Sequence, residues 1–195
     1  MTKNEELRLI RLAASGDRSA AETFIKAHQK SLYGYLVRMS GRPDVAEDVT
    51  QEAFVRVLSN LDRFDPRFRF STWLFTIARR LYLNFCEKRR PSSAGEAVGG
   101  YEGSAVGPQA AASDAEHREF SRDAIQRALL DLSLEQREVL VLFHQLEWPI
   151  WLIADHLGMP EGTVKSHLHR GRRRLRDTIE AQREHRAETP EEVWL

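Results

Sequence analysis

Residues 150–176 read IWLIADHLGMPEGTVKSHLHRGRRRLR, and this stretch decides the fold of the second half of the chain. Its apolar spacing predicts a short helix over 150–157, which Gly158 would end in a left-handed conformation. Ala154, Gly158 and Val164 follow one another at spacings of four and six residues. A small residue where two helices touch, a glycine in the turn and an apolar anchor are what a helix-turn-helix requires.

The second of these helices, expected from about Glu161 past Leu175, is strongly basic. Six basic residues and no acidic one lie between Thr163 and Arg176. Small hydroxyls near the start of a basic helix suit a DNA major groove, because hydroxyls and arginines reach bases and later arginines reach phosphates. A solvated basic face on an ordinary helical hairpin is the alternative. The outward face is predicted to carry Thr163, Ser166, His167, Arg170 and Arg174, flanked by Lys165, His169, Arg172, Arg173 and Arg176.

Two features of this helix allow more than one interpretation. Glu161 has the chemistry to accept a hydrogen bond from a cytosine amino group, but it is also a favourable charge at a helix N-terminus. His167 and His169 invite a zinc site, but residues two apart on a helix face different directions. The single cysteine of the chain, Cys86, excludes a multi-cysteine metal site and an intramolecular disulfide. We therefore expect no metal and no cofactor.

The whole chain has 195 residues, of which 42% are hydrophobic and 30% charged, which is typical of soluble globular proteins. No stretch is long and apolar enough for a transmembrane helix, and the N-terminus lacks the apolar core of a signal peptide. The formal net charge is zero, but residues 1–90 carry 17 basic and 11 acidic side chains. The charge is therefore unevenly distributed, and the second domain has its own basic helix.

Residues 91–115 divide the chain into two pieces. Eighteen of these 25 residues are Gly, Ala, Ser or Pro, a composition typical of a flexible linker. A dispensable surface loop is the alternative. The sequence thus predicts an N-terminal domain over 1–90, a C-terminal helix-turn-helix domain over 116–182, and a polar, acidic tail over 183–195 that ends in Val-Trp-Leu.

Both domains read as entirely helical, so the predicted fold class is all-α, with no strand alternation in either piece. Asp17, Asp44 and Ser71 are predicted N-caps of three helices in the first domain, and Ser133 of one in the second. The predicted inner face of the helix after Ser71 is Leu74, Ile77, Ala78, Leu81 and Phe85. The segment 61–70 is predicted to be a loop.

Two surfaces of the first domain carry candidate binding residues. The helix that starts near Asp44 has a concentrated acidic side, which is a candidate docking face for a basic partner and otherwise a solvated face. The helix after Ser71 and the loop before it interleave aromatic and basic residues, which suits stacking on unpaired bases. Simple core packing of those rings is the alternative. The acidic set is Asp44, Glu47, Asp48, Gln51 and Glu52; the aromatic and basic set is Arg63, Phe64, Arg67, Phe68, Arg69, Phe70, Trp73, Thr76, Arg79, Arg80, Asn84 and Lys88.

Five stretches together resemble one family. They read SGDRSAAETFIKAHQKSLYGYL, DVAEDVTQEAFVRV, FRFSTWLFTIARRLYLNFCEKRR, LSLEQREVLVLF and IADHLGMPEGTVKSHLHRGRRRLR, and they follow the family's order and spacing. The chain resembles a bacterial RNA polymerase sigma factor of the extracytoplasmic-function (ECF) group. The resemblance implies a non-enzymatic initiation factor in the cytoplasm, with core RNA polymerase and promoter DNA as partners and an anti-sigma factor as regulator.

The resemblance also implies a role for each surface. The acidic set would dock on the clamp coiled coil of the largest polymerase subunit, and the second domain would contact the flap of the second subunit. The −10 element would be melted and captured by Arg63, Phe64, Arg67, Phe68, Trp73, Arg79, Arg80, Asn84 and Lys88. The −35 element would be read by Glu161, Thr163, Lys165, Ser166, His167, Arg170, Arg173 and Arg174.

Some residues depart from the family pattern, and other classes of function stay open. Asn84 stands where an aspartate is common and His167 where an arginine is common, which leaves the promoter sequence undecided. Trp148 and Trp151 either pack between helices or offer a partner an anchor. A stand-alone DNA-binding regulator, whose reading helix would be residues 163–168, and a sigma mimic that sequesters an anti-sigma factor are the competing classes. An enzyme is disfavoured because no nucleophile–base pair or metal-ligand spacing is present.

Overall fold

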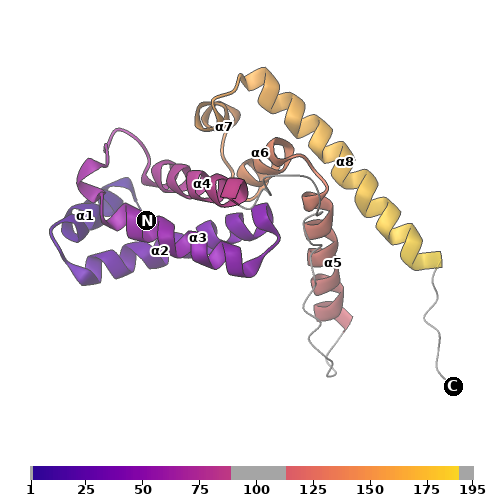
Figure 1. Ribbon diagram of the computed structural model, residues 1–195, viewed down its shortest axis with the longest axis horizontal. Helices are drawn as coiled ribbons and strands as arrows, with labels where there is room; N and C mark the ends of the chain where they lie inside the picture. Colours follow the sequence, from indigo (N-terminus) through magenta and orange to yellow (C-terminus); the bar gives the residue numbers. More distant parts are fainter. Residues whose placement is uncertain (1, 89–112, 189–195) are drawn as a thin grey trace. The chain divides into compact units, whose positions relative to one another are not determined.

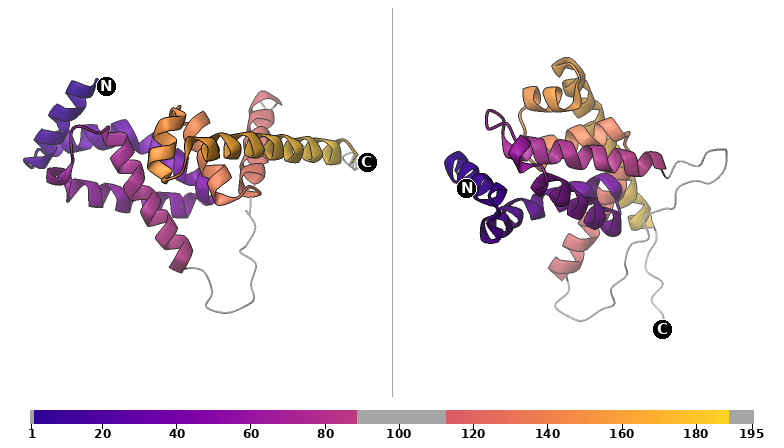
Figure 2. Two further views of the ribbon diagram at one scale, coloured as in Figure 1. Left: turned by 90° about the horizontal axis from the view of Figure 1, so that it is seen from above. Right: turned by 60° about the vertical axis from the view of Figure 1, so that its left-hand side comes forward.

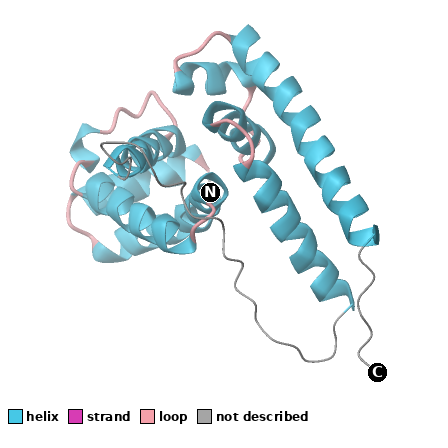
Figure 3. Cartoon of the chain, turned by 45° about the vertical axis from the view of Figure 1, so that its right-hand side comes forward, coloured by secondary structure: helices cyan, strands magenta, loops and turns pink. Residues whose placement is uncertain are grey.

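The computed structural model describes residues 2–88 and 113–188, and all regular structure in these two ranges is helical (Figures 1 and 3). The chain divides into two compact units, one on each side of the gap between the described ranges. The all-α fold predicted from the sequence is confirmed. Most of the predicted linker, residues 91–112, lies outside the described residues, whereas residues 113–115 already belong to a helix.

Over residues 2–88 the first unit contains four α-helices and one short 3₁₀ helix. They are α1 (Lys3–Ala14), α2 (Arg18–Ser40), α3 (Pro43–Leu58), η1 (Leu61–Arg63) and α4 (Phe70–Lys88). Helix α2 packs on α1 and on α3, and α3 packs on α4 (Figures 1 and 2). The packed apolar core is built mainly from Phe24, Leu32, Tyr35, Leu36, Met39, Val49, Val57, Phe70, Leu74 and Phe75.

Helix ends in this unit follow the sequence at some positions and not at others. Asp17 is the N-cap of α2 and accepts a hydrogen bond from the Ala20 amide, as predicted. Gly41 ends α2 in the left-handed conformation. The predicted cap at Asp44 is wrong: Arg42 is the N-cap of α3, and Pro43 occupies its first position. Proline there needs no amide hydrogen, so the helix begins two residues earlier than a cap at Asp44 would place it, and Asp44 lies in its first turn.

Helix α4 also differs from its prediction. It begins at Phe70, so Ser71 lies inside it and is not its cap. Its buried residues are Phe70, Leu74, Phe75, Ala78 and Tyr82, whereas the predicted inner residues Ile77, Leu81 and Phe85 are only half-buried. The core face is rotated because the large rings take the interior positions, and the Tyr82 hydroxyl donates to the buried Met39 carbonyl at 2.9 Å.

The second unit contains α5 (Ser113–Leu130), α6 (Leu134–His144), α7 (Ile150–Leu157) and α8 (Glu161–Glu188). Helix α8 packs on the other three. The bounds of α7 and its left-handed end at Gly158, with φ of 67°, match the prediction. Helix α8 continues six residues beyond the expected limit at residue 182, so the predicted tail begins inside it.

Two contacts fix the joint between α5, α6 and α8. Ser133 caps α6 by accepting from the Gln136 amide at 3.3 Å. The Arg137 guanidinium donates to three carbonyls at the end of α5, those of Leu129, Leu130 and Leu132. The Leu129 carbonyl also accepts from the Leu132 amide at 3.2 Å, and Arg137 supplies a donor to carbonyls that the end of a helix leaves without an intrahelical partner. This side chain therefore holds α6 against the end of α5.

No helix in the described part of the chain combines the length and the apolar character needed to cross a membrane.

Candidate functional site

The acidic side of α3 is exposed, as the sequence predicts, but its charges are not equivalent. Asp44 is hydrogen-bonded by the Arg42 guanidinium, which lowers the pKa of its carboxyl group. Glu52 forms an ion pair with Arg56 at 2.7 Å. Among the described residues, Asp48 has no such partner, and it therefore presents an uncompensated negative charge. The exposed set is Asp44, Glu47, Asp48, Gln51 and Glu52.

A cluster of rings joins α2 to the start of α4. Phe70 is fully buried, and its ring centroid lies 4.2 Å from that of Phe24 and 5.2 Å from that of His28. Phe64 and Trp73 are half-buried and lie 5.5 Å apart, each against Phe70. Core packing is therefore the role of Phe70, while Phe64 and Trp73 are packed on one side and accessible on the other.

Most of the remaining residues of the predicted aromatic and basic set are exposed, whereas Thr76 is half-buried. Phe68 is 59% exposed, which is unusual for a phenylalanine without a partner. Arg67 is held by Asp65 at 2.5 Å, and this contact lowers the pKa of the Asp65 carboxyl group. Arg79 is half-buried. The exposed positions are Arg63, Arg67, Phe68, Arg69, Arg80, Asn84 and Lys88.

The predicted outward face of α8 is only partly outward. Ser166, Arg170, Arg173 and Arg174 are exposed, as are Glu161 and Lys165, which face each other at 3.8 Å. Thr163 and His167 are half-buried, because each comes one residue, about a quarter of a helical turn, before a buried residue, Val164 or Leu168. The Nδ1 atom of His167 is enclosed without a hydrogen-bond partner in the described part of the chain.

The two tryptophans near the turn have opposite environments. Trp148 is 8% exposed and packs edge-on against the His156 ring at 5.1 Å. Trp151, the second residue of α7, is 62% exposed. The choice between packing and a partner anchor is therefore resolved differently for the two: Trp148 packs inside the unit, and Trp151 lies free on its surface.

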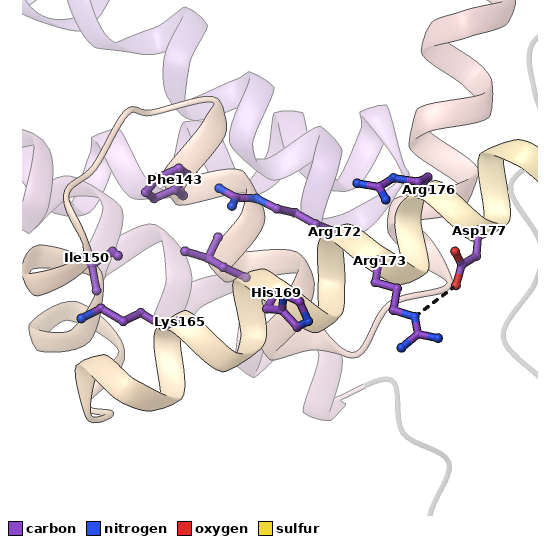
Figure 4. A pocket seen from close by; sticks show the side chains of 9 residues that line it. Phe143, Ile150, Lys165, His169, Arg172, Arg173, Arg176 and Asp177 are labelled. Carbon is purple, nitrogen blue, oxygen red and sulfur yellow. Dashed lines mark ion pairs between the residues drawn. The ribbon is translucent and has the colours of Figure 1, made fainter.

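A basic pocket beside α8 was not predicted. It measures about 480 Å³, and Phe143 of α6, Ile150 of α7 and Leu168 of α8 supply its apolar lining (Figure 4). Arg172 lies over the Phe143 ring at 5.1 Å and donates from Nε to His144 Nε2 at 3.1 Å. The basic spacing of α8 was visible in the sequence, but the approach of Phe143 from α6 was not.

Comparison with known families assigns both units. Residues 24–91 match the model of Sigma-70 region 2, and residues 122–175 match that of Sigma-70, region 4. These ranges include the acidic side of α3, the ring cluster and the first half of α8. The chain is thus a sigma factor of the sigma-70 family, a class of transcription initiation factors that are not enzymes.

Curated relatives place it within that class. It is 35% identical to the ECF RNA polymerase sigma factor SigW of Bacillus subtilis, over 87% of this chain and 94% of that one. It is 32% identical to SigL of Mycobacterium tuberculosis, over 86% and 93%. The chain belongs to the ECF group of sigma factors, and the resemblance inferred from the five sequence stretches is confirmed.

Solved structures agree with this fold. CnrH in complex with the cytosolic domain of CnrY aligns with a TM-score of 0.67 and 24% identity, over 91% of this chain and 98% of that one. The sigma factor RpoE in complex with the anti-sigma factor NepR from Bartonella quintana aligns with a TM-score of 0.64 and 25% identity, over 82% and 96%.

The match to Sigma-70 region 2 excludes the alternative class of stand-alone DNA-binding regulators, because that class does not account for the first unit.

Proposed function

We propose that this protein directs core RNA polymerase to promoters by docking through α3, capturing melted −10 DNA with the ring cluster and α4, and reading the −35 element with α8. The observation that carries the proposal is that the two family matches cover the very helices that present these three surfaces.

The docking step rests on the charge of α3. Asp48 and its neighbours form an exposed acidic surface on a domain whose sequence is otherwise basic. Such a surface favours a basic partner and speeds its encounter. In a sigma factor that partner is the clamp coiled coil of the largest polymerase subunit. Because Asp48 has no ion-pair partner in the described residues, its charge is fully available for this contact.

Capture of the −10 element rests on the half-buried rings. Phe64 and Trp73 are held in place by Phe70 beneath them, and each keeps an accessible face. Rings fixed in this way stack on unpaired bases at little entropic cost. Phe68 supplies a further exposed ring, and Arg63, Arg80 and Lys88 supply exposed cations for the strand backbone. Binding energy alone would stabilise the melted DNA, without nucleotide hydrolysis.

Reading of the −35 element rests on the first half of α8. Ser166, Arg170 and Arg173 are exposed there and match the chemistry that reaches base edges and phosphates in a major groove. Thr163 and His167 would contribute from the border of this face. Glu161 pairs with Lys165, which favours a helix-terminal role over direct base contact. The same unit would meet the flap of the second polymerase subunit.

Regulation by an anti-sigma factor is part of the proposal. RpoE and CnrH were both solved in complexes, RpoE with an anti-sigma factor and CnrH with the cytosolic domain of CnrY. A partner of that kind would cover the docking and DNA surfaces until it is released. We place this activity in the cytoplasm, where core RNA polymerase works.

The first test is a titration of labelled protein against core RNA polymerase. Wild type should bind tightly, and Asp48→Arg should bind at least tenfold more weakly, which corresponds to about 1.4 kcal/mol. Glu22→Arg is the charge-matched control, because Glu22 is also an exposed acid of the same unit but lies on α2, where its substitution removes one exposed ion pair with Lys26. Thermal unfolding of both variants shows whether they are folded.

Each result is informative. Equal binding by Asp48→Arg and wild type would keep the sigma role but exclude this part of α3 from the interface. No binding by wild-type protein purified free of any inhibitor would overturn the proposed function. An equal loss in Glu22→Arg would show that the effect follows net charge and not a defined surface.

A further inference from the structure

Helix α1 has no role in the three surfaces of the proposed function. It lies before residue 24, where the match to Sigma-70 region 2 begins. It nevertheless packs on α2, which carries Phe24, and on η1, which immediately precedes Phe64 (Figure 1). Thr2 caps the start of α1 through a capping box with Glu5, so the backbone of the first turn is fixed. Glu6, in that turn, is therefore held in a defined position.

One side chain of α2 connects α1 to the ring cluster. The ring centroid of His28 lies 5.1 Å from that of Phe24 and 5.2 Å from that of Phe70. The Nε2 atom of the same ring lies 3.3 Å from Oε1 of Glu6, and the two side chains are only 14% and 18% exposed. This Nε2 atom is shielded from solvent and has no well-aligned hydrogen bond within the described part of the chain.

The chemistry of this contact makes the position of the imidazole depend on Glu6. A ring nitrogen shut away from water costs free energy unless a polar partner satisfies it. The Glu6 carboxylate is the acceptor placed to do so, and the contact becomes charge-assisted when His28 carries a proton. Without the carboxylate, the imidazole gains free energy by turning its nitrogen out to water, and that movement takes the ring away from Phe24 and Phe70.

We propose that Glu6 and His28 are positioning residues for the surface that captures −10 DNA. The Glu6 carboxylate holds the His28 ring against Phe70, and Phe70 supports Phe64 and Trp73, whose ring centroids lie 5.5 and 5.7 Å from its own. Neither positioning residue needs to touch DNA, because both act through Phe70. Their role in DNA capture rests on the proposed function, whereas the coupling between Glu6 and Trp73 is a property of the free protein.

The composition of the first unit gives this coupling a specific spectroscopic signature. His28 is the only histidine and Trp73 the only tryptophan among residues 1–99. An imidazole changes its charge between about pH 5 and 8, where ordinary carboxyl and ammonium groups do not titrate. The charged neighbour of His28 is Glu6 from α1, and its neighbours from α2 and α4 are the neutral rings of Phe24 and Phe70. A change at Trp73 in this range of pH that depends on His28 therefore reports the coupling.

The first experiment is fluorine-19 NMR of the full chain labelled with 5-fluorotryptophan, in which Trp73→Phe identifies the Trp73 resonance. We expect this resonance to move by more than its line width between about pH 5 and 8 in wild type, and not to move in His28→Gln. In Glu6→Gln it should already be displaced at neutral pH. Glu5→Gln is the matched control, because it removes a charge from the same turn while glutamine preserves the capping box. A Trp73 resonance that ignores Glu6→Gln, or that responds equally to Glu5→Gln, would overturn the proposal.

The second experiment separates positioning from docking and from stability. Glu6→Gln should bind core RNA polymerase as tightly as wild type but open promoter DNA about threefold less, measured by permanganate reactivity well below its unfolding temperature. Addition of His28→Gln should bring no further loss, because both changes break the same contact. Additive losses, or a parallel loss of core binding, would refute the positioning role. If wild-type protein opens no promoter, the proposed function fails, while the NMR result still decides whether Glu6 and His28 position the ring cluster.

Discussion

Replacement of Phe70 by alanine tests whether the ring cluster is the support of the proposed DNA-capturing surface. Phe70 is fully buried and touches rings from α2, from the segment before α4 and from α4 itself. Truncation of a buried phenylalanine costs about 3–5 kcal/mol through lost transfer energy and the cavity left behind. Phe24, Phe64 and Trp73 all border that cavity, so the loss should lie within this range.

That cost predicts a large shift in the unfolding of one unit only. For a domain of this size, about 1 kcal/mol lowers the melting temperature by roughly 4–8 °C, so a loss of about 3 kcal/mol corresponds to roughly 12–24 °C. Differential scanning calorimetry of the full chain should show the transition of the first unit moving down while that of the second stays unchanged. Phe68→Ala is the matched control, because Phe68 is mostly exposed and its loss should cost less than about 0.5 kcal/mol.

Similar shifts for Phe70→Ala and Phe68→Ala would refute this account of the cluster. The rings would then not be stacked on Phe70, and the positions of Phe64 and Trp73 would need another explanation. If the stability prediction holds, Phe70→Ala should also impair open-complex formation at a temperature where the first unit is still folded, measured by permanganate reactivity of promoter thymines.

Three further predictions concern the second unit. Trp148→Ala should destabilise it by about 3–5 kcal/mol, whereas Trp151→Ala should change its thermal unfolding little because that ring is exposed. Partial burial, and then the nearby Arg172, lower the pKa of His144, so the folded state favours the neutral ring. The contribution of His144 to the free energy of unfolding is therefore complete above about pH 6.5 and is lost as the pH falls through the lowered pKa. Urea denaturation across pH 5–8 should show this dependence in wild type and not in His144→Gln. Gly158→Ala should cost about 1–2 kcal/mol in the same assay because φ there is 67°; an unchanged midpoint would contradict the left-handed helix end.

Local signals allowed much of the fold to be predicted from the sequence. Asp17, Ser133 and Gly158 each act on their own helix end, so their chemistry is visible within a few residues. The predicted cap at Asp44 was wrong because Pro43, one residue earlier, also favours a helix start, and the helix begins at the proline. The prediction at Ser71 was wrong because Phe70 enters the core, and the helix begins two residues earlier than a cap at Ser71 would place it.

The site could be predicted only where exposure follows from position along one helix. The acidic side of α3 met that condition. The rings of residues 64–73 did not, because burial of Phe70 and partial exposure of Phe64 depend on Phe24 of another helix. The pocket required Phe143 of α6 to meet Arg172 of α8, a contact between residues 29 positions apart that no spacing rule indicates.

The continuity of α8 has a mechanical consequence. Its 28 residues form one uninterrupted helix, about 42 Å long, from Glu161 beside the turn to Glu188. The half that would enter the major groove and the half that packs on α5 therefore turn as a single rod. A tilt imposed on the far half is therefore carried along the helix to the other end, without any contact to the residues that we propose read DNA.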